Sequence, residues 1–296
     1  MNSRIKSMEA KNPALYRFSL VLTGATFLLI LAGGLVTSHE AGLAVPDWPL
    51  SYGRFFPPMV GNIFWEHGHR MIAGSVGILT LLFAFCTQFG TAAYEIRPAL
   101  RKLAWIALGM VVAQALLGGL TVIYMLPAPV SIAHACLAQT FFCVLIALAY
   151  LLSGVRLAPP ADADLLRSWK RLARTLLVTA ILVYLQLILG ATLRHTGKVL
   201  VPHVVMAFIV VVHVLLVMGR ILRFHGEKAP LSRAGVGLGL LTLVQIFLGM
   251  GSFIFTRMLE RGYAPTHGEV FFTAAHQSTG ALVLGAVVLM NVMVRR

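Results

Sequence analysis

Eight long apolar runs dominate this sequence and leave few folds open to it. Each run has about 20 residues or more, the length that an α-helix needs to cross the hydrocarbon core of a bilayer. An outer-membrane β-barrel is disfavoured, because the runs are continuous and lack the alternating strands of about ten residues. The sequence predicts an all-α membrane protein whose transmembrane helices lie at 16–38, 62–88, 101–125, 130–153, 172–193, 199–222, 233–256 and 270–294.

The placement of positive charge predicts the orientation. Hydrophobic residues make up 58% of the chain, charged residues make up 11%, and the formal net charge is +14. Most of the 24 Lys and Arg residues fall at the two termini and after the second, fourth and sixth runs. Since such residues concentrate on the cytoplasmic side, we expect both termini there and no role for the charge in binding nucleic acid. The first run is too long for a cleaved signal and is expected to be a helix.

Four histidines lie at matching depths, a few residues inside the starts of the even-numbered runs. An imidazole in hydrocarbon is costly unless it is bonded or ligated. For a single histidine, a hydrogen bond across helices would explain the placement, but four in register favour ligation. These residues are His69, His134, His203 and His276.

The odd-numbered runs carry a matching mark near their outer ends. Three of them contain Gln-x-x-x-Gly, and the first contains Gly-Gly. The pattern indicates a helix pair repeated four times, which folds as two pseudo-symmetric four-helix bundles, each with two histidines inside. The predicted parts are 1–156, a cytoplasmic linker at 157–171, and 172–296. The marks are Gln114 with Gly118, Gln186 with Gly190, Gln245 with Gly249, and Gly33-Gly34.

Two imidazoles from facing helices, beside glycines that leave space for a flat ligand, are typical of a haem with axial histidines. Zinc is a weaker alternative, because a closed tetrahedral site needs further His, Cys or carboxylate ligands. The cysteines lie within helices without CxxC spacing and indicate neither a disulfide framework nor a thiolate site. They are Cys86, Cys136 and Cys143.

One carboxylate distinguishes the two bundles. Glu66 precedes His69 by three residues and shares its helix face, and no counterpart is found near His203 or His276. A carboxylate in a membrane is usually functional, and beside a metal centre it can move protons. Pairing with Arg70 or a loop residue is the alternative.

The remaining histidines are not expected to ligate a metal. His67 would point away from His69 on a helix, and His213 lies deeper, where an interhelical contact is expected. Solvation is expected for the histidines in loops and at helix ends, namely His39, His195, His225 and His267.

The first outer loop is too long to be a bare connector. It contains Asp47 and Trp48 together with several aromatic residues and prolines. Such a loop is expected to fold over the first site, although anchoring at the membrane interface would explain its composition equally well. Arg70, near the outer surface, is expected to pair with a haem propionate, with headgroup anchoring as the alternative.

These residues resemble the heme A synthases, over nearly the whole chain from Gly33 to about Gly285. The resemblance is densest in Gly42-Leu-Ala-Val-Pro-Asp-Trp-Pro-Leu50 and in Trp65-Glu66-His67-Gly68-His69-Arg70. The second segment is similar to the Glu-x-x-His-Arg signature of that family. The chain differs from the family pattern at Val45 and Ser51, where many bacterial members carry a cysteine pair. A disulfide in this loop is therefore not expected.

The resemblance implies that His203 and His276 ligate a haem b, and that His69 and His134 with Glu66 form the site where haem O becomes haem A. The C8 methyl of haem O would be oxidised to a formyl group, with the haem b in electron transfer. It implies a bacterial cytoplasmic membrane location, a haem O synthase and a terminal oxidase assembly pathway as partners. The electron donor and any homo-oligomer stay open.

Two other functions are alternatives. A diheme cytochrome b with the same histidine pairs, but without haem-modifying activity, is the main alternative. A prenyltransferase that makes haem O is disfavoured, because the only paired aspartates, Asp162 and Asp164, lie in a short linker rather than in a Mg-diphosphate motif.

Overall fold

The computed structural model describes residues 12–90, 96–259 and 262–295, and eight of its helices are long and apolar enough to cross a membrane. The described residues contain no strand beyond an isolated bridge between Ser51 and Arg54. The predicted all-α membrane fold is confirmed, and the chain is an integral membrane protein. Its helices are α1 (Pro13–Ser38), α2 (Asn62–Phe89), α3 (Pro98–Ile123), α4 (Ala128–Leu152), α5 (Ala163–Thr196), α6 (Leu200–Phe224), α7 (Ala229–Phe253), which continues into the π-helical turn η2 (Ile254–Met258), and α8 (His267–Arg295).

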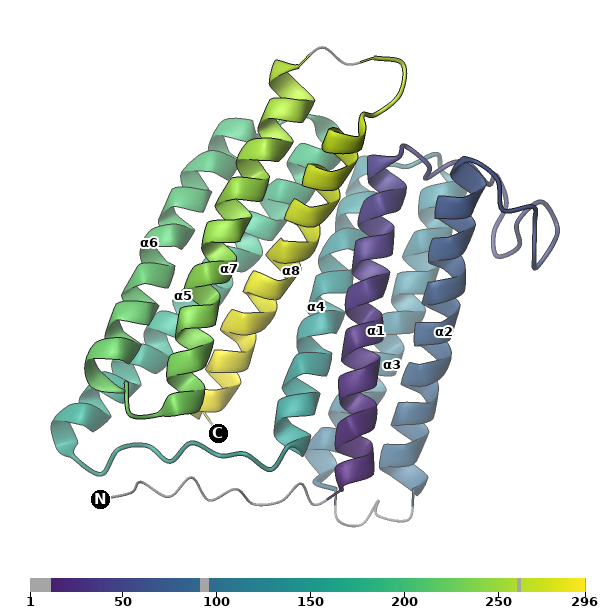
Figure 1. The fold of residues 1–296 in the computed structure, drawn as a ribbon. Helices are drawn as coiled ribbons and strands as arrows, with labels where there is room; N and C mark the ends of the chain where they lie inside the picture. The colour runs from purple at the N-terminus through teal and green to yellow at the C-terminus, as the bar shows by residue number, and fades with distance from the viewer. Residues whose placement is uncertain (1–11, 91–95, 260–261, 296) are drawn as a thin grey trace.

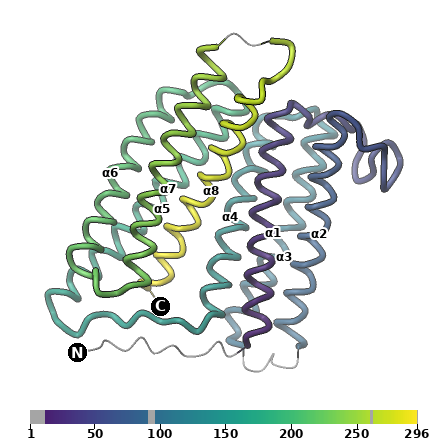
Figure 2. The backbone as a smooth tube through the Cα atoms, in the orientation of Figure 1, coloured from purple at the N-terminus to yellow at the C-terminus, as the bar shows by residue number. Residues whose placement is uncertain are grey.

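The helices form two groups of four, α1 to α4 and α5 to α8 (Figure 1). α8 packs against α1 and α4, and α5 packs against α4, so these helices form the seam between the groups. The tube in Figure 2 places the start of α1 and the end of α8 at the same end of the molecule. Which membrane face this end occupies stays a prediction, and part of the charge bias behind it, in residues 1–11, lies outside the described residues.

α5 begins earlier than the apolar pattern predicts. It starts at Ala163, inside the segment 157–171 assigned to the linker, because the Asp162 carboxylate accepts hydrogen bonds from two backbone N–H groups of the first turn. Such a cap satisfies donors that a helix leaves unpaired. The added turns bury Trp169, whose Nε1 donates to the carbonyl of Val294 at 3.2 Å. Charged residues interrupt the apolar run here, so the apolar pattern did not predict this part of the helix.

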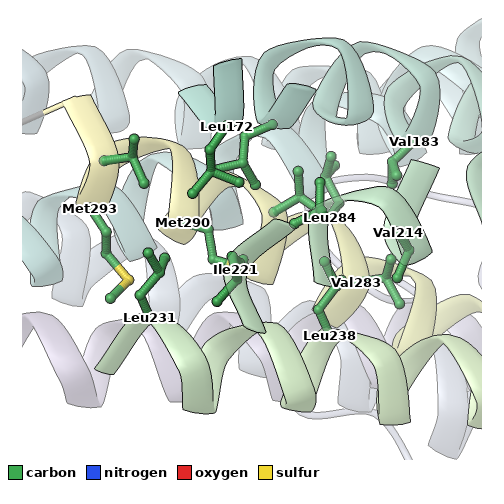
Figure 3. Close-up of a cluster of buried hydrophobic side chains, with 14 of the residues drawn as sticks. Leu172, Val183, Val214, Ile221, Leu231, Leu238, Val283, Leu284, Met290 and Met293 are labelled. Atoms are coloured by element: carbon green, nitrogen blue, oxygen red, sulfur yellow. The ribbon is translucent and has the colours of Figure 1, made fainter. Parts of the chain in front are cut away.

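Closely packed apolar side chains fill each bundle. In the second bundle, Leu172, Ile221, Leu238 and Met290 come from four helices and are fully buried (Figure 3). In the first bundle the fully buried ring of Phe83 meets another phenylalanine edge-on, with 5.5 Å between the ring centroids. Because lipid is as apolar as these side chains, close packing rather than exclusion of water stabilises such cores.

Polar contacts join the two bundles at the end of α1. The Ser38 hydroxyl lies 2.8 Å from the Thr273 hydroxyl on α8 and accepts a hydrogen bond from Arg194 on α5 at 2.7 Å. One turn lower, a Cβ on Gly34 would lie 3.5 Å from the Gln277 amide of α8. Small residues let membrane helices approach closely, so α1 and α8 meet here almost backbone to backbone.

Phe83→Ala should lower the free energy of unfolding by about 3–5 kcal/mol, because it leaves a cavity in a packed core. Phe85 on the same helix is 46% exposed, so Phe85→Ala serves as the matched control and should change stability by less than about 1 kcal/mol. Thermal unfolding of both variants in detergent measures the difference. Equal losses would contradict the burial assigned to Phe83.

Candidate functional site

The four predicted histidines share one packing arrangement. Each imidazole lies against a glycine of the preceding helix, so close that a Cβ on the glycine would stand 2.9–3.3 Å from the Cε1 atom of the ring. The sequence predicts that these glycines leave space for a flat ligand, whereas in the structure the imidazole itself takes that space. The contacts are Gly33 with His69, Gly118 with His134, Gly190 with His203, and Gly249 with His276.

The Gln-x-x-x-Gly motif has a physical explanation at α7. Because Gly249 has no side chain, His276 reaches the helix backbone, and its Nδ1 lies 3.2 Å from the carbonyl oxygen of Gln245. An Nδ1–H donated to this carbonyl leaves the lone pair on Nε2. The Gln245 amide nitrogen lies 3.5 Å from that Nε2, and Gln186 makes the same contact with His203 at 3.3 Å.

His203 and His276 are spaced as two ligands of one metal ion. Their ring centroids are 6.3 Å apart and their planes are inclined by 74°. Imidazoles on opposite sides of one ion, with metal–nitrogen bonds of about 2 Å, have ring centres about 6 Å apart. Within the described ranges no group of three or more His, Cys, Asp or Glu residues could hold a metal. The pair therefore suits a metal whose other ligands come from a cofactor, and a closed zinc site does not fit.

His69 and His134 form the other pair. They come from α2 and α4 of the first bundle, where each ring packs on a glycine of the preceding helix. The Nδ1 atoms of His69 and His203 are buried without a hydrogen-bond partner among the described residues. Position 29, one turn before Gly33, holds Leu29 where the other repeats have glutamine. Buried polar atoms without partners are costly, so unsatisfied imidazoles on both pairs are consistent with ligand sites.

Both carboxylate oxygens of Glu66 are engaged. Oε1 accepts a hydrogen bond from Arg70 Nη2 at 2.5 Å, and Oε2 accepts one from the backbone N–H of Val45 at 2.8 Å. The alternative set out above, pairing with Arg70 and a loop residue, is what the structure contains. Because a buried carboxylate that loses one partner is left uncompensated, Glu66 ties α2 firmly to the loop 39–61 beside His69.

Two further α2 side chains hold the same loop. Arg70 Nη1 donates to the carbonyl oxygens of Asp47 and Leu50, both at 2.8 Å. The hydroxyl of Ser51, which is fully buried, is hydrogen-bonded to His67 Nδ1 at 2.8 Å. Sequence reasoning assigned no role to His67, because a side chain-to-loop bond leaves no periodic signal. The pairing of Arg70 with a haem propionate stays a prediction.

The Asp47 carboxylate shapes the tip of the loop. It accepts hydrogen bonds from the backbone N–H groups of Gly53 at 2.8 Å and Tyr52 at 2.6 Å. These donors, Gly53 first, stabilise the ionised form and lower the pKa of Asp47 from its ordinary value of 3.8. The contact therefore stabilises the loop fully above pH 3.8, and this stabilisation is lost as the pH falls below that value.

Two further histidines test the remaining sequence predictions. His213 lies 3.5 Å from the Thr179 hydroxyl on α5, which agrees with the predicted interhelical contact. The expected solvation of His225 is wrong: the ring is fully buried against Trp169, at 5.3 Å between centroids, because the tryptophan of the capped α5 extension covers it.

Glu269 is a buried carboxylate that the sequence analysis missed. It is 6% exposed and lies two turns before His276 on α8. At 1.5 Å per residue it stands about 10 Å from His276 along the helix, against about 4.5 Å between Glu66 and His69. Glu269 lies more than one helical turn from His276, so a pattern confined to one turn does not include it. Glu66 is the carboxylate nearer to a histidine along its helix.

Comparison with known proteins identifies related sequences. The model of the family described as cytochrome oxidase assembly protein matches residues 16–202, more than half of the chain. Proteins named heme A synthase are similar to it: one from Bacillus pumilus is 29% identical over 188 residues, 62% of this chain and 59% of the relative. One from Exiguobacterium sibiricum is 29% identical over 192 residues, which are 63% of this chain and 61% of the relative. One from a Methylobacterium species is 35% identical over 144 residues, which are 43% of this chain and 38% of the relative. The chain thus matches less than two thirds of the length of each.

Asp47→Ala should speed hydrogen exchange at the Tyr52 and Gly53 amides, because both lose their acceptor. In the unmodified protein, protection of these amides should persist below pH 3.8, because the pKa of Asp47 is lowered from that value, and should be lost as the pH falls through the lowered pKa. Hydrogen exchange with mass spectrometric detection measures both effects. Asp162→Ala, which removes a comparable cap from α5, is the control and should leave the loop amides unchanged; full protection in Asp47→Ala would contradict the role of this carboxylate.

Proposed function

The chain belongs to the cytochrome oxidase assembly protein family, and we propose that it is a heme A synthase, a membrane oxidoreductase that converts haem O into haem A. The observation that carries this proposal is the presence of two histidine pairs in one fold, of which only one stands beside a buried carboxylate within one helical turn. The curated relatives named heme A synthase supply the reaction. The proposal includes a location in the bacterial cytoplasmic membrane. It also includes haem O synthase and a terminal oxidase assembly pathway as partners.

The C-terminal bundle, 172–296, would hold a haem b through His203 and His276. The ring separation of 6.3 Å fits two ligands of one ion. The bond from His276 Nδ1 to the Gln245 carbonyl would fix the ring and raise the basicity of Nε2. A tightly held relay site of this kind needs no carboxylate next to its ligands.

The N-terminal bundle, 1–156, would hold haem O between His69 and His134. When bound, the haem would supply the redox chemistry for the oxidation of its own C8 methyl group to a formyl group, with an external oxidant. The chain contributes position and environment: the two imidazoles orient the macrocycle, and the loop 39–61 limits access of water. Glu66 keeps a negative charge at the edge of the site, where it can accept a proton or stabilise developing positive charge.

Glu66→Gln should abolish most haem A formation, by about a hundredfold or more, while both haems still bind. Glutamine retains an acceptor for the Val45 N–H, so the loop stays in place, but the negative charge is lost. The measurement is expression with a haem O synthase, followed by extraction and mass analysis of the haems.

Glu269→Gln is the matched control, since it neutralises the buried carboxylate of the other bundle, and it should preserve haem A yield. A normal yield from Glu66→Gln would refute the assigned role. If the unmodified protein accumulates only haem b, the diheme cytochrome alternative is favoured instead.

Gly249→Ala should weaken haem binding at the C-terminal site by about tenfold or more. The added Cβ would lie 2.9 Å from His276 Cε1 and displace the ring, whereas Gly237 on the same helix has open space around it. Haem content and the low-spin absorption spectrum of purified Gly249→Ala and Gly237→Ala protein test this. Indistinguishable spectra would count against His276 as a ligand.

A further inference from the structure

Trp48 packs on the bare backbone of α3. A Cβ on Gly119 would lie 2.7–3.0 Å from three atoms of the indole, so the ring occupies the space that a side chain would need. The preceding residue, Gly118, makes the corresponding contact with His134. Consecutive glycines of α3 therefore receive an indole from the outer loop and an imidazole of the N-terminal pair. Trp48 is 36% exposed, so part of its ring has no protein cover.

The loop segment that carries Trp48 is held in place from both sides. Arg70 binds the carbonyl oxygens of Asp47 and Leu50, and Glu66 accepts the N–H of Val45. Both anchoring side chains stand on α2 within one turn of His69. The indole consequently has a defined position relative to both histidines of the N-terminal site.

In the second bundle the corresponding connection is too short to supply such a cover. α5 and α6 are joined by residues 197–199 alone, whereas α1 and α2 are joined by residues 39–61. The indole therefore belongs to one histidine pair and not to the other.

We propose that Trp48 is a binding residue of the N-terminal site, where its indole covers a flat aromatic macrocycle held between His69 and His134. The identity of the macrocycle as a haem rests on the proposed function. An indole offers a large apolar face, and aromatic pairs gain binding energy beyond the area they bury. Trp48 therefore slows the escape of the macrocycle towards the outer surface and keeps water from its face.

The test measures release of iron protoporphyrin IX from purified full-length protein in detergent, with an excess of a haem-scavenging protein. The parent is His276→Ala, which confines binding to the N-terminal site. Adding Trp48→Ala should speed haem loss about three- to tenfold, and Trp48→Phe should stay closer to the parent because it retains a flat ring.

Gly119→Ala is a second, independent test variant, because its added Cβ displaces the Trp48 indole without removing it. It should reproduce the effect of Trp48→Ala, and the double variant should lose haem no faster than either single variant, since both changes act on one contact. Trp105→Ala is the matched control: Trp105 lies on α3 and is 39% exposed, but it packs against Phe85 instead.

The results distinguish a failure of the Trp48 proposal from a failure of the proposed function. Equal haem loss from Trp48→Ala and its parent would overturn the role of Trp48. Equally accelerated loss from the C-terminal site, measured in a His134→Ala parent, would overturn it as well, because the effect would then be a general destabilisation. If the His276→Ala parent takes up no haem at all, the proposed function itself fails.

Discussion

An imidazole inside a membrane has no water to bond with, and the arrangement of this protein depends on how its histidines meet that constraint. His69, His134, His203 and His276 each lie against a glycine of the preceding helix, where the helix surface is open enough for a ring to approach the backbone. At α7 the approach ends in a bond from His276 to the Gln245 carbonyl. The same small residues that allow close helix packing thus also position these four imidazoles.

One repeated unit therefore yields two sites with different surroundings. In the C-terminal bundle, glutamine amides contact the imidazoles, and the α5–α6 connection is minimal. In the N-terminal bundle, Leu29 replaces a glutamine, and a long loop is bound to α2 through Glu66 and Arg70. The C-terminal histidines thus lie beside glutamine amides and a short connection, whereas the N-terminal histidines lie beside a long loop and a buried ion pair. The proposed division into a relay site and a reactive site rests on this difference.

The sequence allowed most of the fold to be predicted, because membrane thickness sets the length of every apolar run. It missed the start of α5, where Asp162 caps a helix that charged residues interrupt. The depth of the histidines could also be recognised. The partners of Glu66 could not be assigned, because one of them is the backbone N–H of Val45, 21 residues away, and backbone donors leave no mark in a sequence. Burial of His225 depends on Trp169, which a local pattern cannot place.

The two adjacent glycines of α1 have a mechanical consequence. Gly33 touches His69, while Gly34 touches Gln277, the residue next to His276. A single turn of α1 thus contacts both His69 and the part of α8 that carries His276. A displacement of α1 at this turn would therefore disturb the packing of both histidines together.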